Sequence, residues 1–171
     1  MKKLPPIEKI YEAWSALADG RVEEDSGSKA ECKAKNTENW TASQGAAYVF
    51  SSDGSKVYRV TWKEAVYTSN DNASYWQGYA GYPILAVLML QKKLPYDPKV
   101  AACLGGINWN ELNARYKAKY DRAVDEILEG LEGKAEVAAI RLEAENTYRC
   151  LANLEILCRR SAWRPPSSAL K

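Results

Sequence analysis

The spacing of hydrophobic positions changes twice along the chain and divides it into three stretches. Over residues 7–18, apolar side chains recur every three or four positions, which predicts an amphipathic helix. Over residues 21–68 the period is two, which is typical of half-buried strands, and after the next loop helical spacing returns. On the face of the first helix opposite its apolar side lie three charged residues: Glu8, Lys9 and Glu12.

The strongest turn signal lies in the stretch with period two. Two runs rich in β-branched and aromatic residues, 46–51 and 56–62, flank a turn that contains Asp53 and Gly54. Because Asp-Gly readily adopts the positive φ values of a tight hairpin turn, these runs are predicted to pair as antiparallel strands. A further half-buried strand is expected at residues 30–34. One face of the second run should be apolar and buried: Tyr58, Val60 and Trp62.

The C-terminal half carries the pattern of several helices. Residues 84–90 are apolar on every side, as in a helix buried at the centre of a domain. Asn108 and Glu111 have the spacing of a capping box, which predicts the start of a helix that should end near residues 130–133. A last helix is predicted over residues 135–163.

These elements predict one α+β domain that spans residues 1–171. We expect an antiparallel β-meander of four or five strands that follows an N-terminal helix and is covered by a helical C-terminal half. The sheet should occupy residues 21–68 and the helices residues 82–163, while residues 164–171 should form a frayed tail.

Composition and charge narrow the class of protein. Hydrophobic residues make up 46% and charged residues 27% of the 171 residues, which are globular proportions. The net charge of +2 gives only weak support to a nucleic-acid partner. The longest apolar run, 79–90, is too short to cross a bilayer, and charged residues follow Lys3 where a signal peptide would be apolar. We therefore expect a soluble, cytoplasmic protein with no membrane partner.

Histidine is absent from the sequence, and this excludes several kinds of chemistry. Catalytic Ser-His-Asp and Cys-His arrangements and histidine metal ligands are ruled out, so we lean against an enzyme. The cysteines are too irregularly spaced for a zinc site or a disulfide framework. If Cys150 and Cys158 share one helix, they lie about 12 Å apart along its axis, too far for a disulfide. We expect no metal and no cofactor, and the composition is compatible with a thermophilic source.

The stretch 69–83, SNDNASYWQGYAGYP, is the first candidate functional site. A carboxylate and several amides stand beside large aromatic rings, which is typical of a loop that holds a ring-shaped ligand or a partner side chain. The same composition suits rings that plug the junction between sheet and helices, with Asn and Ser bonding the loop backbone. The candidate ligand-binding residues are Asn70, Asp71, Asn72, Tyr75, Trp76, Gln77, Tyr79 and Tyr82.

The predicted last helix carries the second candidate site. Its apolar positions alternate three and four residues apart and form a narrow seam, as in coiled-coil-like pairing. Either this seam is a homodimer interface, or it packs onto the helix that begins at Asn108. The candidate interface residues are Val137, Ile140, Ala144, Leu151, Leu154 and Cys158.

These features favour a non-catalytic binding or interaction module that associates with itself through the last helix. Its site at residues 69–83 would take a small ligand or a peptide. One alternative is a sequence-tolerant binder of single-stranded nucleic acid, which would use the aromatic residues of sheet and loop together with scattered lysines. A second alternative is a small histidine-free enzyme that uses Asp71 with a nearby tyrosine or lysine.

Overall fold

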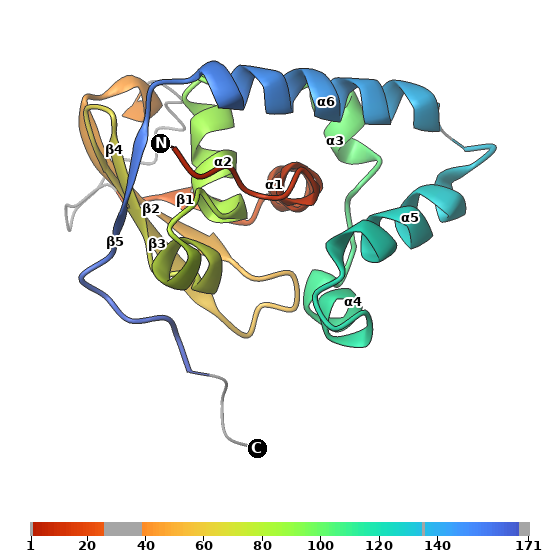
Figure 1. Cartoon of the computed structure of the whole chain (residues 1–171), viewed down its shortest axis with the longest axis horizontal. Coiled ribbons are helices and arrows are strands. Elements are labelled where there is room, and N and C mark those ends of the chain that lie inside the picture. The colour runs from red at the N-terminus through yellow and green to blue at the C-terminus, as the bar shows by residue number, and fades with distance from the viewer. Residues whose placement is uncertain (1, 26–38, 135, 168–171) are drawn as a thin grey trace, which may run out of the picture.

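The predicted order of elements is confirmed by a computed structural model, which describes residues 2–25, 39–134 and 136–167. Within these ranges, an N-terminal helix leads into a five-stranded sheet, and a helical C-terminal half follows (Figure 1). The fold is therefore α+β, as expected. The strand expected at residues 30–34 lies outside the described residues.

The sheet is antiparallel except at its last pair of strands. Among the described residues its strands are β1 (Val22–Glu24), β2 (Gln44–Phe50), β3 (Val57–Lys63), β4 (Val66–Ser69) and β5 (Leu157–Arg160), in that spatial order. The predicted hairpin is β2–β3, and at its turn Gly54 has a φ of 72° while Asp53 Oδ1 accepts a hydrogen bond from the amide of Ser55 at 3.0 Å. The predicted apolar face of β3 is buried: Tyr58, Val60 and Trp62.

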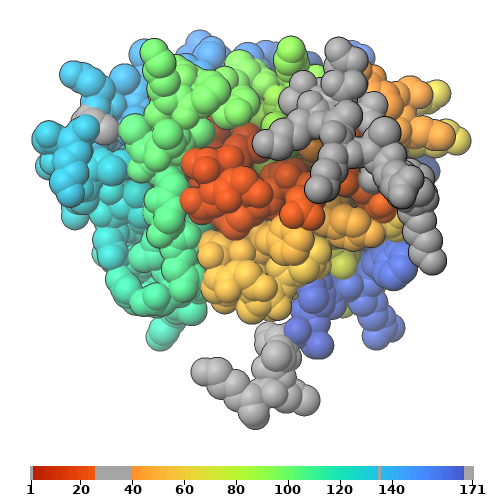
Figure 2. All heavy atoms as spheres, turned by 180° about the vertical axis from the view of Figure 1, so that it is seen from behind, coloured from red at the N-terminus to blue at the C-terminus, as the bar shows by residue number. Residues whose placement is uncertain are grey.

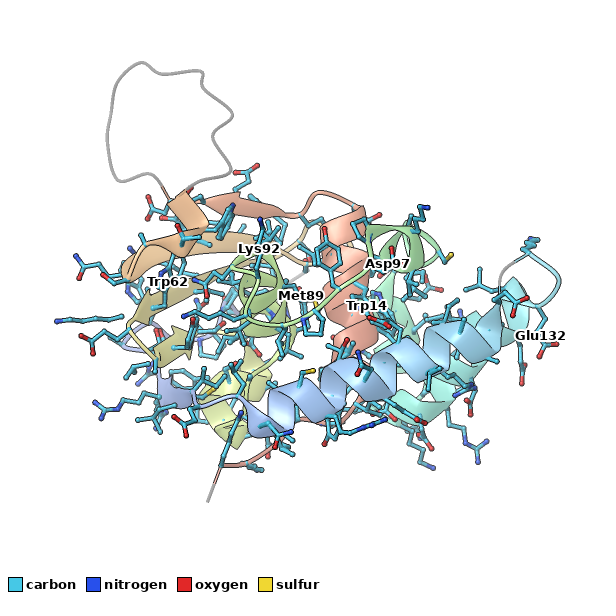
Figure 3. The ribbon with its side chains drawn as sticks, turned by 90° about the horizontal axis from the view of Figure 1, so that it is seen from above. Trp14, Trp62, Met89, Lys92, Asp97 and Glu132 are labelled. Atoms are coloured by element: carbon cyan, nitrogen blue, oxygen red, sulfur yellow. The ribbon has the colours of Figure 1, made fainter. Side chains whose placement is uncertain are left out.

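The helices pack in layers on the sheet. The described helical elements are α1 (Glu8–Ala18), η1 (Asn39–Thr41), the π-helical turn η2 (Ala73–Gln77), α2 (Tyr82–Leu90), α3 (Pro98–Ala102), α4 (Trp109–Arg115), α5 (Tyr120–Leu131) and α6 (Val137–Asn153). Helix α2 contacts β3 and β4, α1 packs on α2, and α6 crosses α1 (Figure 1). Figure 3 shows Trp14 of α1 and Met89 of α2 in the interior, and the predicted burial of residues 84–90 is confirmed for residues 84–89.

The helix predicted to run from Asn108 to residues 130–133 is broken in two, so this prediction was wrong. Its start is correct, because Asn108 Oδ1 accepts a hydrogen bond from the amide of Glu111 at 3.2 Å. Helix α4 ends at Arg115, and Lys117 and Ala118 take positive φ values of 51° and 60° before α5 begins. This left-handed pair reverses the chain, and Arg115 then reaches back to Glu126 of α5 at 2.8 Å.

The last helix ends ten residues before residue 163, where it was predicted to end, which is a second correction. Helix α6 ends at Asn153, and β5 follows and pairs in parallel with β4, with Tyr67 opposite Cys158. An open strand edge offers unpaired backbone groups, and pairing with it outweighs the continuation of the helix. Cys150 and Cys158 therefore do not share a helix, and both are free thiols.

Contacts on the far face hold α4 and the segment before it against the hairpin and the end of α1. Figure 2 shows the end of α1, in red-orange, between the green segment of α3 and α4 and the yellow-orange hairpin. The amide of Gly106 donates to Asp19 Oδ1 at 2.8 Å, and the amide of Asn110 donates to Ser52 Oγ at 3.2 Å. The first bond ties the segment before α4 to the C-terminal end of α1, and the second ties α4 to the hairpin turn. Among the described residues, no helix has the length and apolar content needed to span a membrane.

Candidate functional site

A cavity of about 270 Å³ lies where the stretch after β4 meets α1, β3, α4 and the start of α5. The stretch predicted as a candidate site supplies one part of its lining: Asp71, Asn72, Ala73, Trp76, Gln77, Tyr79 and Tyr82. The other part comes from elements that are far apart in the sequence: Lys9, Glu12, Tyr58, Asn110, Asn113 and Tyr120. The cavity thus combines carboxylates, a lysine, amides and aromatic rings.

A buried ion pair on α1 forms one wall of the cavity. Lys9 Nζ and Glu12 Oε1 are 3.0 Å apart, and their side chains are only 7% and 4% exposed. The same Glu12 oxygen accepts a hydrogen bond from Asn113 Nδ2 at 3.1 Å. Burial by itself would lower the pKa of Lys9, but the charges of Glu12 and Tyr120 outweigh it and raise that pKa. Lys9 therefore stays protonated, and Glu12 neutralises it.

An aromatic ring from α5 covers the same lysine. The Nζ atom of Lys9 lies 4.0 Å from the ring centroid of Tyr120, within the range of a cation–π interaction. Tyr120 is the first residue of α5, and it reaches α1 because the chain reverses at Lys117 and Ala118. The unexpected break between α4 and α5 therefore completes this side of the cavity.

Asp71 also lines the cavity, and its carboxylate is fixed by its own turn. Its Oδ2 accepts a hydrogen bond from the amide of Ser74 at 3.0 Å, and Ser74 Oγ accepts one from the amide of Gly81 at 3.0 Å. Asp71 is 4% exposed, and among the described residues its Oδ1 has no hydrogen-bond partner. Buried polar atoms are normally bonded, so this oxygen is an acceptor whose hydrogen-bonding capacity is unused.

Three tyrosines of the lining keep neutral hydroxyl groups. Burial raises the pKa of Tyr58 to about 12, and the charge of Asp71 adds to this effect. Burial also raises the pKa of Tyr79, although Lys9 opposes it, and raises the pKa of Tyr82 well above its ordinary value. The rings of Tyr58 and Tyr82 meet edge to face, with centroids 6.2 Å apart. At neutral pH these side chains are hydrogen-bonding groups and flat surfaces, not bases.

Most of the predicted ligand-binding residues line the cavity, and two lie outside it. Asn70 is a structural residue: its Oδ1 accepts from the amide of Arg59 at 2.7 Å, and its Nδ2 donates to the carbonyl of Arg164 at 3.2 Å. The ring of Tyr75 instead lies 4.1 Å from the guanidinium of Arg160. The six predicted residues in the lining are Asp71, Asn72, Trp76, Gln77, Tyr79 and Tyr82.

The aromatic rings of residues 69–83 differ in their exposure to solvent. Tyr79 is 8% exposed and Trp76 is 64% exposed, although both line the cavity. Tyr79 is therefore part of the packed wall, as the plug interpretation expected, whereas Trp76 stands at the solvent side. Burial of Tyr79 fits the plug interpretation, and ligand binding by residues 69–83 stays a prediction.

The seam expected on the last helix packs into the chain itself. Ile140, Ala144 and Leu151 belong to the buried core, where α6 meets α1. Val137 and Leu154 are partly buried against the same core. Cys158 lies on β5 and not on the helix, which corrects its placement. These contacts account for the seam by packing within the chain, and self-association stays a prediction.

Sequence reasoning missed six residues of the lining: Lys9, Glu12, Tyr58, Asn110, Asn113 and Tyr120. The charged side of α1 was identified, but the pattern gave no sign that another helix covers it. A buried Lys–Glu pair three residues apart looks the same in sequence as a solvated one. Only the tertiary arrangement distinguishes them.

The side chains that line this cavity offer charges, hydrogen-bonding groups and ring faces. Within the described ranges, no group of three or more His, Cys, Asp or Glu side chains is arranged to hold a metal ion. Lys9 is held charged and the tyrosines are held neutral, so the groups with shifted pKa values are shifted away from neutral pH. General bases need the opposite shift.

One comparison with known proteins gave a match. No curated protein and no solved structure matches the chain. The family described as Uncharacterised conserved protein UCP014422 matches residues 2–157, a range that contains every residue of the cavity lining. Because this match extends over most of the sequence, the chain belongs to the UCP014422 family.

Proposed function

We propose that the chain is a non-catalytic binding module that holds a small polar ligand in the cavity beside Asp71. The observation that carries this proposal is that Asp71 lines the cavity while its buried Oδ1 has no hydrogen-bond partner among the described residues. At about 270 Å³ the cavity lies just below the usual range for ligand pockets, so the ligand is small. Ring faces and amides in the lining would supply contact area and orientation.

The alternative of an enzyme that uses Asp71 receives less support. Asp71 would need a partner that exchanges protons near neutral pH. The neighbouring tyrosines have pKa values raised by burial, and Lys9 is bound to Glu12 and keeps its proton. A preorganised set of fixed charges suits binding better than proton transfer.

The proposal is tested by filling the cavity. Ala73 lines it, so Ala73→Trp should block it, and Ala139→Trp on an exposed position of α6 is the matched control. Ligand-observed NMR with a mixture of small polar metabolites should show compounds that bind the wild type and Ala139→Trp but not Ala73→Trp. Binding that survives equally in Ala73→Trp would refute the cavity as the site.

A second candidate function, single-strand nucleic-acid binding, is favoured by a surface that shares Trp76 with the cavity lining. The guanidinium of Arg160 lies 4.1 Å from the ring of Tyr75 and 5.1 Å from that of Trp76, and Arg59 lies 5.5 Å from the ring of Trp163. Trp76 and Trp163 are 64% and 61% exposed. Exposed rings beside arginines suit stacked bases and phosphates.

Salt dependence tests this second candidate. The affinity for a fluorescent oligothymidylate should fall steeply as salt rises, and Arg160→Ala should reduce both the affinity and the slope. Arg122→Ala, an exposed arginine on α5, is the matched control. This candidate would be refuted by an affinity that does not change with salt. It would also be refuted if Arg160→Ala and Arg122→Ala reduced the affinity equally.

A further inference from the structure

We propose, on the basis of the binding function proposed above, that the ligand of this cavity carries a primary ammonium group that binds Asp71 Oδ1 between the tyrosine rings. The side chains of the lining contain two buried oxygens without a partner among the described residues: Asp71 Oδ1 and Asn113 Oδ1. Both are acceptors, and no buried unpartnered nitrogen of the described residues belongs to this lining. The complementary ligand is therefore a donor, and an ammonium has three N–H groups and no acceptor.

The charges of the lining favour a positive ligand. Lys9 is neutralised by Glu12 at 3.0 Å. Asp71 takes part in none of the ion pairs found in the described part of the chain. A buried carboxylate without a counter-charge is costly, so a cation that enters the cavity gains more than a neutral donor of the same shape.

The rings at this place already bind ammonium groups of the chain itself. Lys9 Nζ lies 4.0 Å from the ring centroid of Tyr120, and Lys3 Nζ lies 5.5 Å from that of Tyr79. Tyrosine faces attract cations through their quadrupole, and the attraction grows where water is excluded. A ligand ammonium at Asp71 would meet the same kind of surface in Tyr58 and Tyr79, which are both 8% exposed.

An anionic ligand fits this lining poorly. It would face Asp71 and Glu12, and the cation of the lining, Lys9, already contacts Glu12 and the Tyr120 ring. A neutral hydroxyl could donate to Asp71 Oδ1, but it would leave the carboxylate charge uncompensated. Cationic, neutral and anionic ligands are therefore expected to bind the cavity with different affinities.

The test compares three probes with one carbon skeleton: pentylammonium, pentanol and pentanoate. Their dissociation constants are measured by NMR chemical-shift titration of the tyrosine ring signals of the wild-type protein. Pentylammonium should bind about tenfold more tightly than pentanol, and pentanoate should bind more weakly still. Asp71→Asn should lose the preference for pentylammonium. Glu132→Gln, which removes the same charge at the far end of the molecule (Figure 3), should keep it.

The relative affinities of the three probes for the wild-type protein test the ammonium inference even if Asp71→Asn does not fold. If pentanol or pentanoate binds the cavity as tightly as pentylammonium, the ammonium inference is overturned while the binding function stands. A second outcome is that none of the three probes binds, but a metabolite without an ammonium group binds the wild type and not Ala73→Trp. The ammonium inference is then overturned, and the proposed binding function stands. A wild-type protein that binds neither the probes nor any metabolite in the cavity contradicts both proposals.

Discussion

The carboxylate of Asp71 packs directly against the backbone of Gly81. A Cβ atom at position 81 would lie 2.9 Å from Asp71 Cγ and 3.0 Å from Oδ1, which is closer than side chains tolerate. The amide of Gly81 also donates to Ser74 Oγ, and the amide of Ser74 donates to Asp71. Glycine at 81 therefore allows the turn that holds Asp71 in the cavity wall.

Replacing this glycine should disturb the site. Gly81→Ala should destabilise the protein by about 1–3 kcal/mol, because the new methyl group displaces the Asp71 carboxylate. It should also weaken the binding of pentylammonium. Gly130→Ala is the matched control: a Cβ there meets no atom within 4 Å, and alanine suits α5, so stability should stay the same or rise by up to about 1 kcal/mol. Urea unfolding measures the stability of both variants. Equal changes in the free energy of unfolding would contradict the contact between Asp71 and Gly81.

The buried ion pair should be strongly coupled. Glu12→Gln should cost about 3 kcal/mol or more, because it leaves the Lys9 ammonium buried without its counter-charge. Adding Lys9→Met to this variant should recover part of the loss, since the unpaired charge is then gone. Urea unfolding of the four proteins of this double-mutant cycle gives the coupling energy.

An exposed pair serves as the control for that cycle. Glu111 and Arg115 are 3.1 Å apart on α4, with side chains 63% and 50% exposed. Solvent screens such a pair, so Glu111→Gln should leave the free energy of unfolding nearly unchanged. Losses of equal size for Glu12→Gln and Glu111→Gln would show that Lys9 and Glu12 are not buried together.

Stability should fall in alkaline solution. Burial raises the pKa of Tyr11 and of Tyr58 from 10.0 to about 12. Between these values the unfolded state binds fewer protons than the folded state, so the free energy of unfolding decreases as pH rises. Lys9 acts in the same direction, because its raised pKa contributes stability that is lost as pH rises through the folded-state value. Urea unfolding on both sides of pH 10 measures the slope, and Tyr58→Phe should make it shallower. A free energy of unfolding that does not change with pH would contradict the burial of these tyrosines.

Local signals predicted the parts of the fold that local sequence decides. Asp53 and Gly54 specify the β2–β3 turn whatever surrounds them, and Asn108 caps α4 through a residue three positions away. Strand β5 could not be predicted in this way, because the same residues continue the helical spacing of α6. The open edge of β4 decides their conformation, and that edge lies about ninety residues earlier in the chain.

Only part of the candidate site could be predicted, again because local sequence decides some of its residues and distant contacts decide the others. The composition of residues 69–83 pointed to Asp71 and Tyr79, since a carboxylate beside rings is visible in a short window. Lys9 and Glu12 needed knowledge of what covers α1. That cover depends on the reversal at Lys117 and Ala118, where no glycine or proline marks a turn.

The most direct test of the ligand site is oxidative footprinting with and without pentylammonium, read at the tryptophans by mass spectrometry. Trp76 and Trp163 are 64% and 61% exposed, but only Trp76 of this pair lines the cavity, and Trp14 is fully buried. In the free protein Trp76 and Trp163 should be oxidised readily and Trp14 should not. Saturating pentylammonium should protect Trp76 and leave Trp163 unchanged. Equal protection of Trp76 and Trp163, or no protection of Trp76, would contradict an ammonium site in this cavity.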